Sequence, residues 1–283
     1  MFKHNLTAYE YQEELKKIGI KLDVHTGHLF YDRDFKAPSL NFELVFVRHG
    51  ETYGNCGQGT SNGNVDYNLV NKNLKDVHKR IFQGDVDNDI NQLTEYGRQQ
   101  ACNAAKKLKD NLLKNGWKPD IIFSSPLKRA RQTALPFITE NNFESRFIIH
   151  SGIKEMSFGA WDNCRVDCMR ENDPCHSFYR EQHALVKCSG KNAHGLYQEA
   201  ENFCDVLLRA QNVLKNISIE YHGKKILMFS HSMFGAACCI LAGKGQKIES
   251  GEYLAFDGKR QDGSFYIMPH AEPFFLNFGK RVN

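Results

Sequence analysis

The sequence predicts an α/β fold, a three-layer α/β/α sandwich with a mostly parallel central sheet. Short apolar segments of strand character alternate with longer segments in which apolar residues recur at helical spacing. Several polar residues also come directly after the predicted strands. Alternating strands and helices are typical of a sheet covered by helices on both faces, and such sheets bind ligands at the carboxyl ends of their strands.

Four buried strands are predicted from compact apolar runs, and a hairpin-like pair closes the sheet. The hairpin is expected at residues 253–256 and 265–268. The four strands are expected at residues 42–47, 120–123, 147–150 and 225–229.

Three long helices are expected between these strands. Thr94 can N-cap the first helix, and Asn115-Gly116 would end it. Pro126 is well placed to open the second. In residues 203–217, apolar residues recur at helical spacing and would form one face of the third helix.

The chain is interpreted as one large domain with an added N-terminal segment. Residues 1–40 form an N-terminal extension that begins with a short amphipathic helix, and residues 41–283 form the domain. Within the domain, residues 56–82 are a Gly- and Asn-rich insertion, and residues 160–195 are a polar, Cys-rich lid.

Composition excludes some partners. The 283 residues are 41% hydrophobic and 25% charged, as in ordinary soluble proteins, and a net charge of +4 is too small to favour nucleic acid. The most apolar stretch, residues 226–242, is interrupted by Ser230, His231 and Ser232, so it predicts a strand, a turn and a helix. Residues 1–17 lack the apolar run of a secretory signal. We expect a cytoplasmic protein with no membrane and no nucleic-acid partner.

The nine cysteines are scattered along the chain. Cys164, Cys168, Cys175 and His176 are close enough in sequence to raise a zinc site as an alternative. They lack a paired C-x-x-C motif and a second ligand pair at a finger-like distance. Reduced thiols are therefore expected, with no metal and no cofactor.

Polar groups suited to phosphate chemistry follow the predicted strands. A phosphate monoester carries close to two negative charges, which bidentate arginines hold well. A neutral imidazole can attack phosphorus, and a nearby carboxylic acid can protonate the leaving alkoxide. Arg48, His49, Arg129, Glu155 and His231 supply these parts.

An ordered series of motifs extends this pattern over roughly residues 42–256. It comprises Arg48-His49-Gly50-Glu51-Thr52 with Asn55, Gln83-Gly84, Leu93-Thr94 with Gly97, Gln100 and Ala101, Ser124-Ser125-Pro126 with Arg129-Ala130 and Thr133-Ala134, Glu155 with Phe158-Gly159 and Trp161, and Ser230-His231. The series resembles the signature of the histidine phosphatase superfamily, in its phosphoglycerate mutase-like branch.

The resemblance implies a role for each of these positions. His49 would be the nucleophile, and Glu155 the proton donor and later the base that activates water. Arg48, Arg129 and His231 would form the phosphate pocket, and no metal would be needed. Further substrate-binding positions would be Asn55, Gln83, Gly84 and Ser232. Glu201 resembles the acidic residue of the family's Gly-Glu-Ser motif and receives a supporting role.

The sequence also departs from the family pattern. Ser232 stands where a Gly is common, and Asp162-Asn163 replaces the usual Glu-Gly after Trp161. Basic residues of the lid could bind a second anionic group of the substrate, but a role as surface charges is favoured. These residues are Arg165, Arg170, Arg180 and Lys187, and Arg80 near Gln83 is interpreted in the same way.

The leading hypothesis is a metal-independent phosphatase acting on a small phosphorylated metabolite through a phosphohistidine. One alternative is a phosphoglycerate mutase using the same phosphohistidine, which would have to exclude water. The run after Glu155, Phe158 to Asn163, is closer to the phosphatase style. The other alternative is a non-catalytic module that binds phosphate esters. The natural substrate is left unassigned, and a homodimer is left open.

Overall fold

The computed structural model describes residues 6–55, 81–89, 91–165, 170–192, 195–248, 251–257 and 268–278. The predicted insertion at 56–82 therefore lies almost wholly outside the described residues, as do Arg80, Cys168 and His194. The helices are α1 (Ala8–Lys16), α2 (Glu95–Asn111), α3 (Lys128–Glu140), α4 (Pro174–Arg180), α5 (Phe203–Glu220) and α6 (Ser232–Leu241). The strands are β1 (Ile20–Leu22), β2 (Leu29–Tyr31), β3 (Glu43–Arg48), β4 (Ile121–Ser124), β5 (Phe147–Ile149), β6 (Gly190–Lys191), β7 (Tyr197–Gln198), β8 (Lys225–Ser230), β9 (Gln246–Lys247), β10 (Leu254–Ala255) and β11 (Pro273–Leu276).

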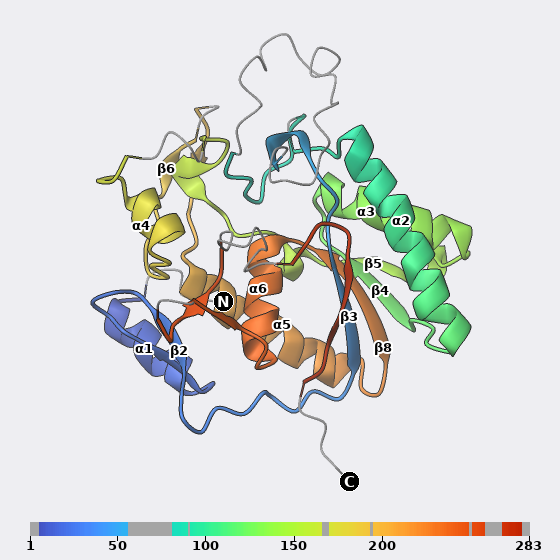
Figure 1. Ribbon diagram of the computed structural model, residues 1–283, viewed down its shortest axis with the longest axis horizontal. Helices are drawn as coiled ribbons and strands as arrows, with labels where there is room; N and C mark the ends of the chain where they lie inside the picture. Colours follow the sequence, from blue (N-terminus) through green and yellow to red (C-terminus); the bar gives the residue numbers. More distant parts are fainter. Residues whose placement is uncertain are drawn as a thin grey trace.

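A five-stranded sheet forms the centre of the molecule (Figure 1). Its strand order is β11-β3-β8-β4-β5, and only the edge strand β11 runs antiparallel to its neighbour. The mostly parallel sheet predicted from the sequence is confirmed. In the register of β3 and β8, Arg48 lies opposite Ser230, so both strands end at the same edge.

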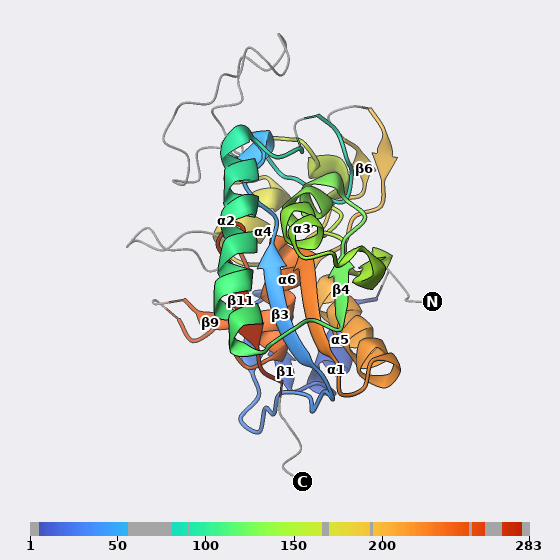
Figure 2. The ribbon, with the colours of Figure 1, turned by 90° about the vertical axis from the view of Figure 1, so that its right-hand side faces the viewer.

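Helices cover both faces of this sheet, which confirms the three-layer sandwich (Figure 2). Alternate residues of β3 point to opposite faces, as the period of a strand requires. Val45 and Val47 belong to the apolar cluster formed with α2 and α3, whereas Leu44 and Phe46 belong to the cluster formed with α5 and α6. The central strands are thus buried on both sides, which explains their unbroken apolar sequences.

The predicted helix boundaries hold with small corrections. Thr94 N-caps α2, and its hydroxyl accepts a hydrogen bond of 2.8 Å from the Gly97 N–H. The α-helix ends before Asn115, and a short 3-10 turn continues to Gly116, whose φ of 77° is one that glycine adopts without strain. Pro126 precedes α3, which begins at Lys128.

A second, four-stranded sheet joins the N-terminal segment to a distant part of the chain. Its order is β1-β2-β10-β9. Leu254 of β10 pairs with Leu29 on one side and with Lys247 on the other. The predicted hairpin between residues 253–256 and 265–268 is therefore wrong, because both edges of β10 are already occupied. Residues 265–267 lie outside the described residues.

The N-terminal helix α1 packs on α5 through a buried polar contact. The Tyr11 hydroxyl donates to Asp205 at 2.5 Å, and Lys187 forms an ion pair of 3.0 Å with the same carboxylate. Asp205 lies in the first turn of α5, where a negative charge is favourable. Within the described residues, no helix is both long enough and apolar enough to cross a membrane.

Candidate active site

Two buried histidines lie side by side at the carboxyl edge of the central sheet. His49 follows β3 and His231 follows β8. The His49 N–H donates to the Ser230 carbonyl at 3.0 Å, which continues the strand pairing by one residue. The two imidazole rings lie 5.3 Å apart between centroids, and their exposed fractions are 2% and 0%. The parallel pairing of β3 and β8 therefore brings together two histidines that are far apart in the sequence.

The hydrogen bonds of His49 define its reactive nitrogen. Its Nδ1 lies 2.7 Å from the carbonyl oxygen of Gly50. A carbonyl can only accept, so Nδ1 carries the proton and Nε2 carries the lone pair in the neutral ring. Burial lowers the pKa of His49 well below its usual range, and the cations Arg129 and Arg48 and the neighbouring His231 lower this pKa further. This shift in pKa favours the neutral imidazole, the form in which a histidine can act as a nucleophile.

Close backbone packing holds the segment after His49. A Cβ atom on Gly50 would lie 2.5 Å from the carbonyl oxygen of Gly97, so only glycine fits there. The Gly50 N–H donates to the Thr133 hydroxyl at 2.9 Å. The Glu51 carboxylate accepts from the Thr94 hydroxyl at 3.0 Å, which attaches the segment to the start of α2.

Two buried arginines flank His49. Arg48, the last residue of β3, donates to the Met268 carbonyl at 3.1 Å. Arg129, in the first turn of α3, donates through Nη2 to the Gly84 carbonyl at 2.7 Å. The Nε and Nη1 groups of Arg129 are buried and have no hydrogen-bond partner among the residues that the structure describes. Burial lowers the pKa of Arg129, although Glu155 partly offsets this effect. Unsatisfied guanidinium donors beside a neutral imidazole form a receptor for an anion.

The side chain of Glu155 reaches the N-terminus of α6, and Glu155 is only 3% exposed. Its carboxylate accepts from the Ser232 N–H at 3.1 Å, from the Ser232 hydroxyl at 2.9 Å and from the Met233 N–H at 3.1 Å. These bonds and the cation Arg129 favour the ionised form, but burial outweighs them and raises the pKa of Glu155. A carboxyl group with a raised pKa is suited to proton transfer near neutral pH.

The described residues enclose a narrow cavity of about 30 Å³ beside His49. Its walls combine the polar groups with apolar side chains from two loops and from helix α6. It is lined by Arg48, His49, Asn55, Ile81, Phe82, Gln83, Glu155, Phe158, Ser232 and Met233. A larger cleft of about 620 Å³ shares Glu155 with this cavity but does not include His49.

The four predicted substrate-binding positions all lie in or beside this cavity. The Asn55 amide oxygen accepts from the Thr52 N–H at 2.7 Å. The Gln83 amide is held at both ends, by the Thr52 hydroxyl at 2.7 Å and by Asn91 at 2.6 Å. Gly84 contributes its carbonyl to Arg129, and Ser232 contributes its N–H and hydroxyl to Glu155. Gly84 and Ser232 thus position two other groups of the site, Arg129 and Glu155.

The basic residues of the lid are not among the described residues that line the His49 cavity. Lys187 is paired with Asp205, and the guanidinium of Arg180 lies over the Tyr179 ring. Arg165 pairs through its backbone with Ile81, and the Arg170 N–H donates to Asp173. These contacts are those of structural and surface residues.

Two residues beside the site were not assigned a role from the sequence. The Nδ1 of His270 lies 3.0 Å from the carbonyl oxygen of His49, and the two rings lie 5.7 Å apart. Asp162 is fully buried and accepts from the Gly84 N–H at 2.6 Å. Burial raises the pKa of Asp162 to about 6. His270 belongs to no sequence motif. Asp162 was noted in the sequence only because Asp162-Asn163 departs from the family pattern.

A metal centre receives no support from the part of the chain that the structure describes. No group of three or more His, Cys, Asp or Glu side chains in these ranges could hold a metal ion. Cys164 and Cys175 are free thiols, and burial raises the pKa of each. Cys168, the remaining cysteine of the proposed zinc alternative, lies outside the described residues.

Comparison with known proteins identifies the family. A family model described as the histidine phosphatase superfamily (branch 1) matches residues 44–258. The chain belongs to the histidine phosphatase superfamily. The resemblance noted in the sequence is therefore confirmed, and so is the prediction of a phosphatase of this superfamily.

Relatives of this histidine phosphatase have phosphatase names. A mannitol-1-phosphatase from Eimeria tenella is 32% identical over 289 residues, which cover 94% of this chain and 84% of the relative. A metal-independent phosphoserine phosphatase from Arabidopsis thaliana is 25% identical over 71% of this chain and 68% of its own length. Among solved structures, a phosphoserine phosphatase mutant from Entamoeba histolytica in complex with phosphoserine is 21% identical, with a TM-score of 0.49 over 84% of this chain and 96% of that chain.

Proposed function

We propose that this histidine phosphatase hydrolyses a phosphate monoester through a phosphohistidine on His49, without a metal ion. The observation that carries the proposal is the state of His49. Its Nδ1–H is fixed on the Gly50 carbonyl, its Nε2 is left with a lone pair, and the unsatisfied donors of Arg129 are close by. This combination is what in-line attack on a phosphoryl group needs, since positioning and charge stabilisation dominate that reaction.

In the first half-reaction, His49 Nε2 donates its electron pair to phosphorus and the bond from phosphorus to the ester oxygen breaks. The leaving oxygen takes the proton of the Glu155 carboxylic acid and departs as a neutral alcohol. Arg48 and Arg129 balance the negative charge of the transferring phosphoryl group. The raised pKa of Glu155 supports this role, because part of the carboxyl population keeps its proton closer to neutral pH.

In the second half-reaction, the Glu155 carboxylate takes a proton from a water molecule as that water attacks phosphorus. The bond between phosphorus and His49 breaks, its electron pair returns to Nε2, and inorganic phosphate leaves. Glu155 is then protonated again, and the enzyme is ready for another cycle. The lowered pKa of His231 keeps this second imidazole neutral beside the phosphoryl group, which it contacts as a hydrogen-bond donor.

The proposed substrate is a small phosphorylated metabolite. The cavity beside His49 is small, about 30 Å³, which favours a compact phosphate ester. Ile81, Phe82 and Phe158 give this cavity an apolar wall on which a carbon skeleton can rest. A hexitol 1-phosphate is the first compound to test, because the mannitol-1-phosphatase is similar over nearly the whole chain. Phosphoserine is the second.

The test is phosphate release from a panel of sugar-alcohol phosphates, phosphoserine, phosphoglycerates and p-nitrophenyl phosphate, in the presence of EDTA. Release that resists EDTA and requires His49 is the expected result. Rapid interconversion of 2- and 3-phosphoglycerate with little release would instead make the protein a mutase. Binding of phosphate esters with no turnover of any compound would leave a recognition module.

A further inference from the structure

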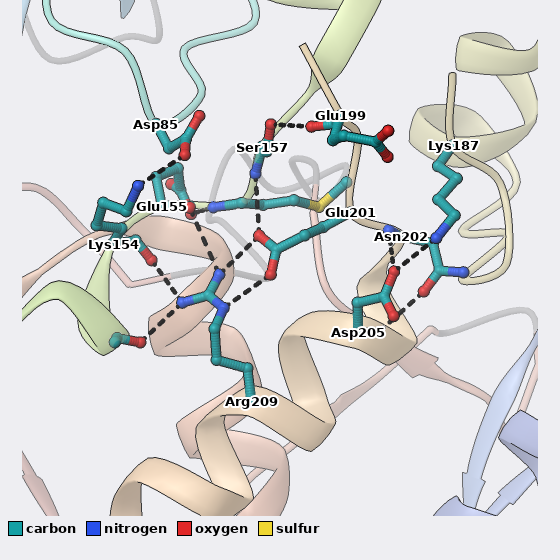
Figure 3. A network of polar contacts seen from close by, with 12 residues as sticks. Asp85, Lys154, Glu155, Ser157, Lys187, Glu199, Glu201, Asn202, Asp205 and Arg209 are labelled. Carbon is teal, nitrogen blue, oxygen red and sulfur yellow. Dashed lines mark hydrogen bonds and ion pairs between the residues drawn. The ribbon is translucent and has the colours of Figure 1, made fainter. Parts of the chain in front are cut away.

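The loop that carries Glu155 is held from behind by a buried ion pair. Arg209 lies on α5, and Glu201 lies just before the N-cap of that helix. The Arg209 Nε and Nη2 groups bond to the two carboxylate oxygens of Glu201, each at 2.8 Å. This fork geometry is the strong form of an arginine–carboxylate pair (Figure 3). The side chains are 18% and 12% exposed, so solvent screens the pair only weakly.

The same guanidinium also holds the backbone around Glu155. Its Nη1 group donates to the carbonyl oxygens of Gly152 at 2.9 Å and Lys154 at 3.0 Å, and Nη2 reaches the Glu155 carbonyl at 3.4 Å. Glu201 completes the contact by accepting from the Ser157 N–H at 3.1 Å. All N–H groups of the guanidinium are used, and their backbone acceptors lie at and before Glu155, while Glu201 binds the Ser157 N–H beyond it (Figure 3).

This loop has little other regular support. In the described ranges, the 3-10 turn Ser151–Ile153 is the only regular element between β5 and Glu155, and the next short element begins at Gly159. The Glu155 side chain binds the N-terminus of α6, while its backbone is fixed on α5 by Arg209. The Arg209 guanidinium also lies 5.4 Å from the ring centre of Phe234 on α6. The pair therefore fixes the backbone of Glu155 on α5, while the carboxyl group of Glu155 is held at the N-terminus of α6.

We propose that Arg209 and Glu201 form a positioning pair that sets the reach of the proton donor Glu155. The inference rests on the proposed function and assigns the pair no contact with substrate. A loosened loop would move the Glu155 carboxyl group without disturbing His49 or the arginines of the phosphate pocket. Loss of the pair therefore slows reactions that need a proton donor and spares those that do not.

The leaving group of the substrate decides whether a reaction needs a proton donor. An alkyl phosphate releases a strongly basic alkoxide that must be protonated, whereas p-nitrophenyl phosphate releases a stable anion. The rate to measure is formation of the phosphoenzyme in a single turnover, because this step precedes the use of Glu155 as a base. Arg209→Lys keeps the charge but loses the fork, and Glu201→Gln keeps the shape but loses the charge.

Both variants are expected to slow phosphoenzyme formation from an alkyl phosphate by roughly 10- to 100-fold, the usual cost of misplacing a catalytic group by about 1 Å. Formation from p-nitrophenyl phosphate should change by less than about threefold, which also shows that the variants are folded. Lys154→Met is the matched control, because it removes the Lys154–Asp85 ion pair of 2.9 Å from the same loop and leaves the Arg209 contacts in place. Its rates should stay near those of the wild type.

Equal rates for wild type and both variants on alkyl phosphates would overturn the inference, and so would an equal loss on both substrates. Both outcomes can be told apart from an error in the proposed phosphatase function. In that case the wild type itself would form no phosphoenzyme that depends on His49, whatever the leaving group.

Discussion

The ends of β3 and β8 make an instructive comparison. Each strand ends at the same edge of the sheet and is followed by a buried histidine. The imidazole of His49 donates to the carbonyl of the residue that follows it, so Nε2 is the free atom. The imidazole of His231 places its Nε2 against the Ser125 hydroxyl at 2.7 Å, and its buried Nδ1 has no partner within the described part of the chain.

The difference separates the roles of two chemically identical side chains. The proton on Nδ1 of His49 is fixed by the Gly50 carbonyl, which leaves Nε2 with the lone pair that the proposed nucleophile needs. The Nε2 of His231 bonds to a hydroxyl, which can donate or accept. The neutral ring of His231 can therefore carry its proton on either nitrogen and can donate it toward a bound phosphoryl group. We expect His49 to be essential and His231 to be assisting, and the predictions below test that ranking.

The largest effect is expected for His49→Ala. Removal of the nucleophile should reduce phosphate release by at least about 1,000-fold for every substrate, because neither half-reaction can then proceed. Phosphate-ester binding should survive, since Arg48 and Arg129 are untouched. The measurement is turnover together with equilibrium binding of inorganic phosphate. Residual turnover above a few per cent would show that another group attacks phosphorus.

A smaller loss is expected for His231→Ala, by roughly 100-fold, because it removes one hydrogen-bond donor to the transition state. Phosphoenzyme should still form slowly, and p-nitrophenyl phosphate and alkyl phosphates should lose similar amounts. Rapid-quench measurement of the phosphoenzyme checks this. If His231→Ala formed none while His49→Ala retained some, the two roles would have to be exchanged.

Glu155→Gln should lower alkyl-phosphate cleavage by about 100-fold and p-nitrophenyl phosphate cleavage much less in a single turnover. Burial raises the pKa of Glu155, so the acid form that drives the first step is lost as pH rises through this raised pKa. The rate of phosphoenzyme formation from an alkyl phosphate should fall at high pH in the wild type and be flat in the variant. An equal loss on both substrates would remove Glu155 from the acid role.

The smallest effect on activity, but a measurable one on stability, is expected for Asp162→Asn. Burial raises the pKa of Asp162 from 3.8 to about 6, so the folded state binds a proton there more tightly than the unfolded state. That contribution to stability is fully present below pH 3.8 and is lost as pH rises to about 6. The change corresponds to roughly 3 kcal/mol as an upper limit.

The check is the free energy of unfolding of both proteins between pH 4 and 7 by urea denaturation. The wild type should lose stability relative to Asp162→Asn across this range, because only the wild type has a carboxyl group to ionise in the buried position. Parallel pH profiles for the two proteins would mean that Asp162 is already ionised in both the folded and the unfolded state.

The sequence predicted the part of the site that depends on strand ends. Arg48 ends β3, and His49 and His231 directly follow β3 and β8. Both strands have clear apolar runs, and their parallel pairing places these ends together. Glu155 was also expected to follow a strand, and the motif series gave roles to Glu155 and Arg129. The expectation that these residues meet needed only strand order and the family pattern, whereas their individual hydrogen bonds were not predicted.

Other features depend on packing between distant segments that no local pattern records. The strands β1, β2, β9 and β10 are two or three residues long, too short for a periodic signal, so their sheet was not predicted. Arg209 meets carbonyl groups more than fifty residues away along the chain. His270 precedes an antiparallel edge strand and carries no motif, so its position beside His49 could be found only from the fold.

The most direct test of the account is to trap the phosphorylated residue. Wild-type protein would be mixed with a labelled phosphate monoester, quenched in alkali, where phosphohistidine survives, and digested for mass spectrometry. The account predicts phosphate on His49, through Nε2, and none in the His49→Ala variant. Phosphate on His231, on a serine or on a cysteine, or turnover with no labelled protein at all, would contradict it.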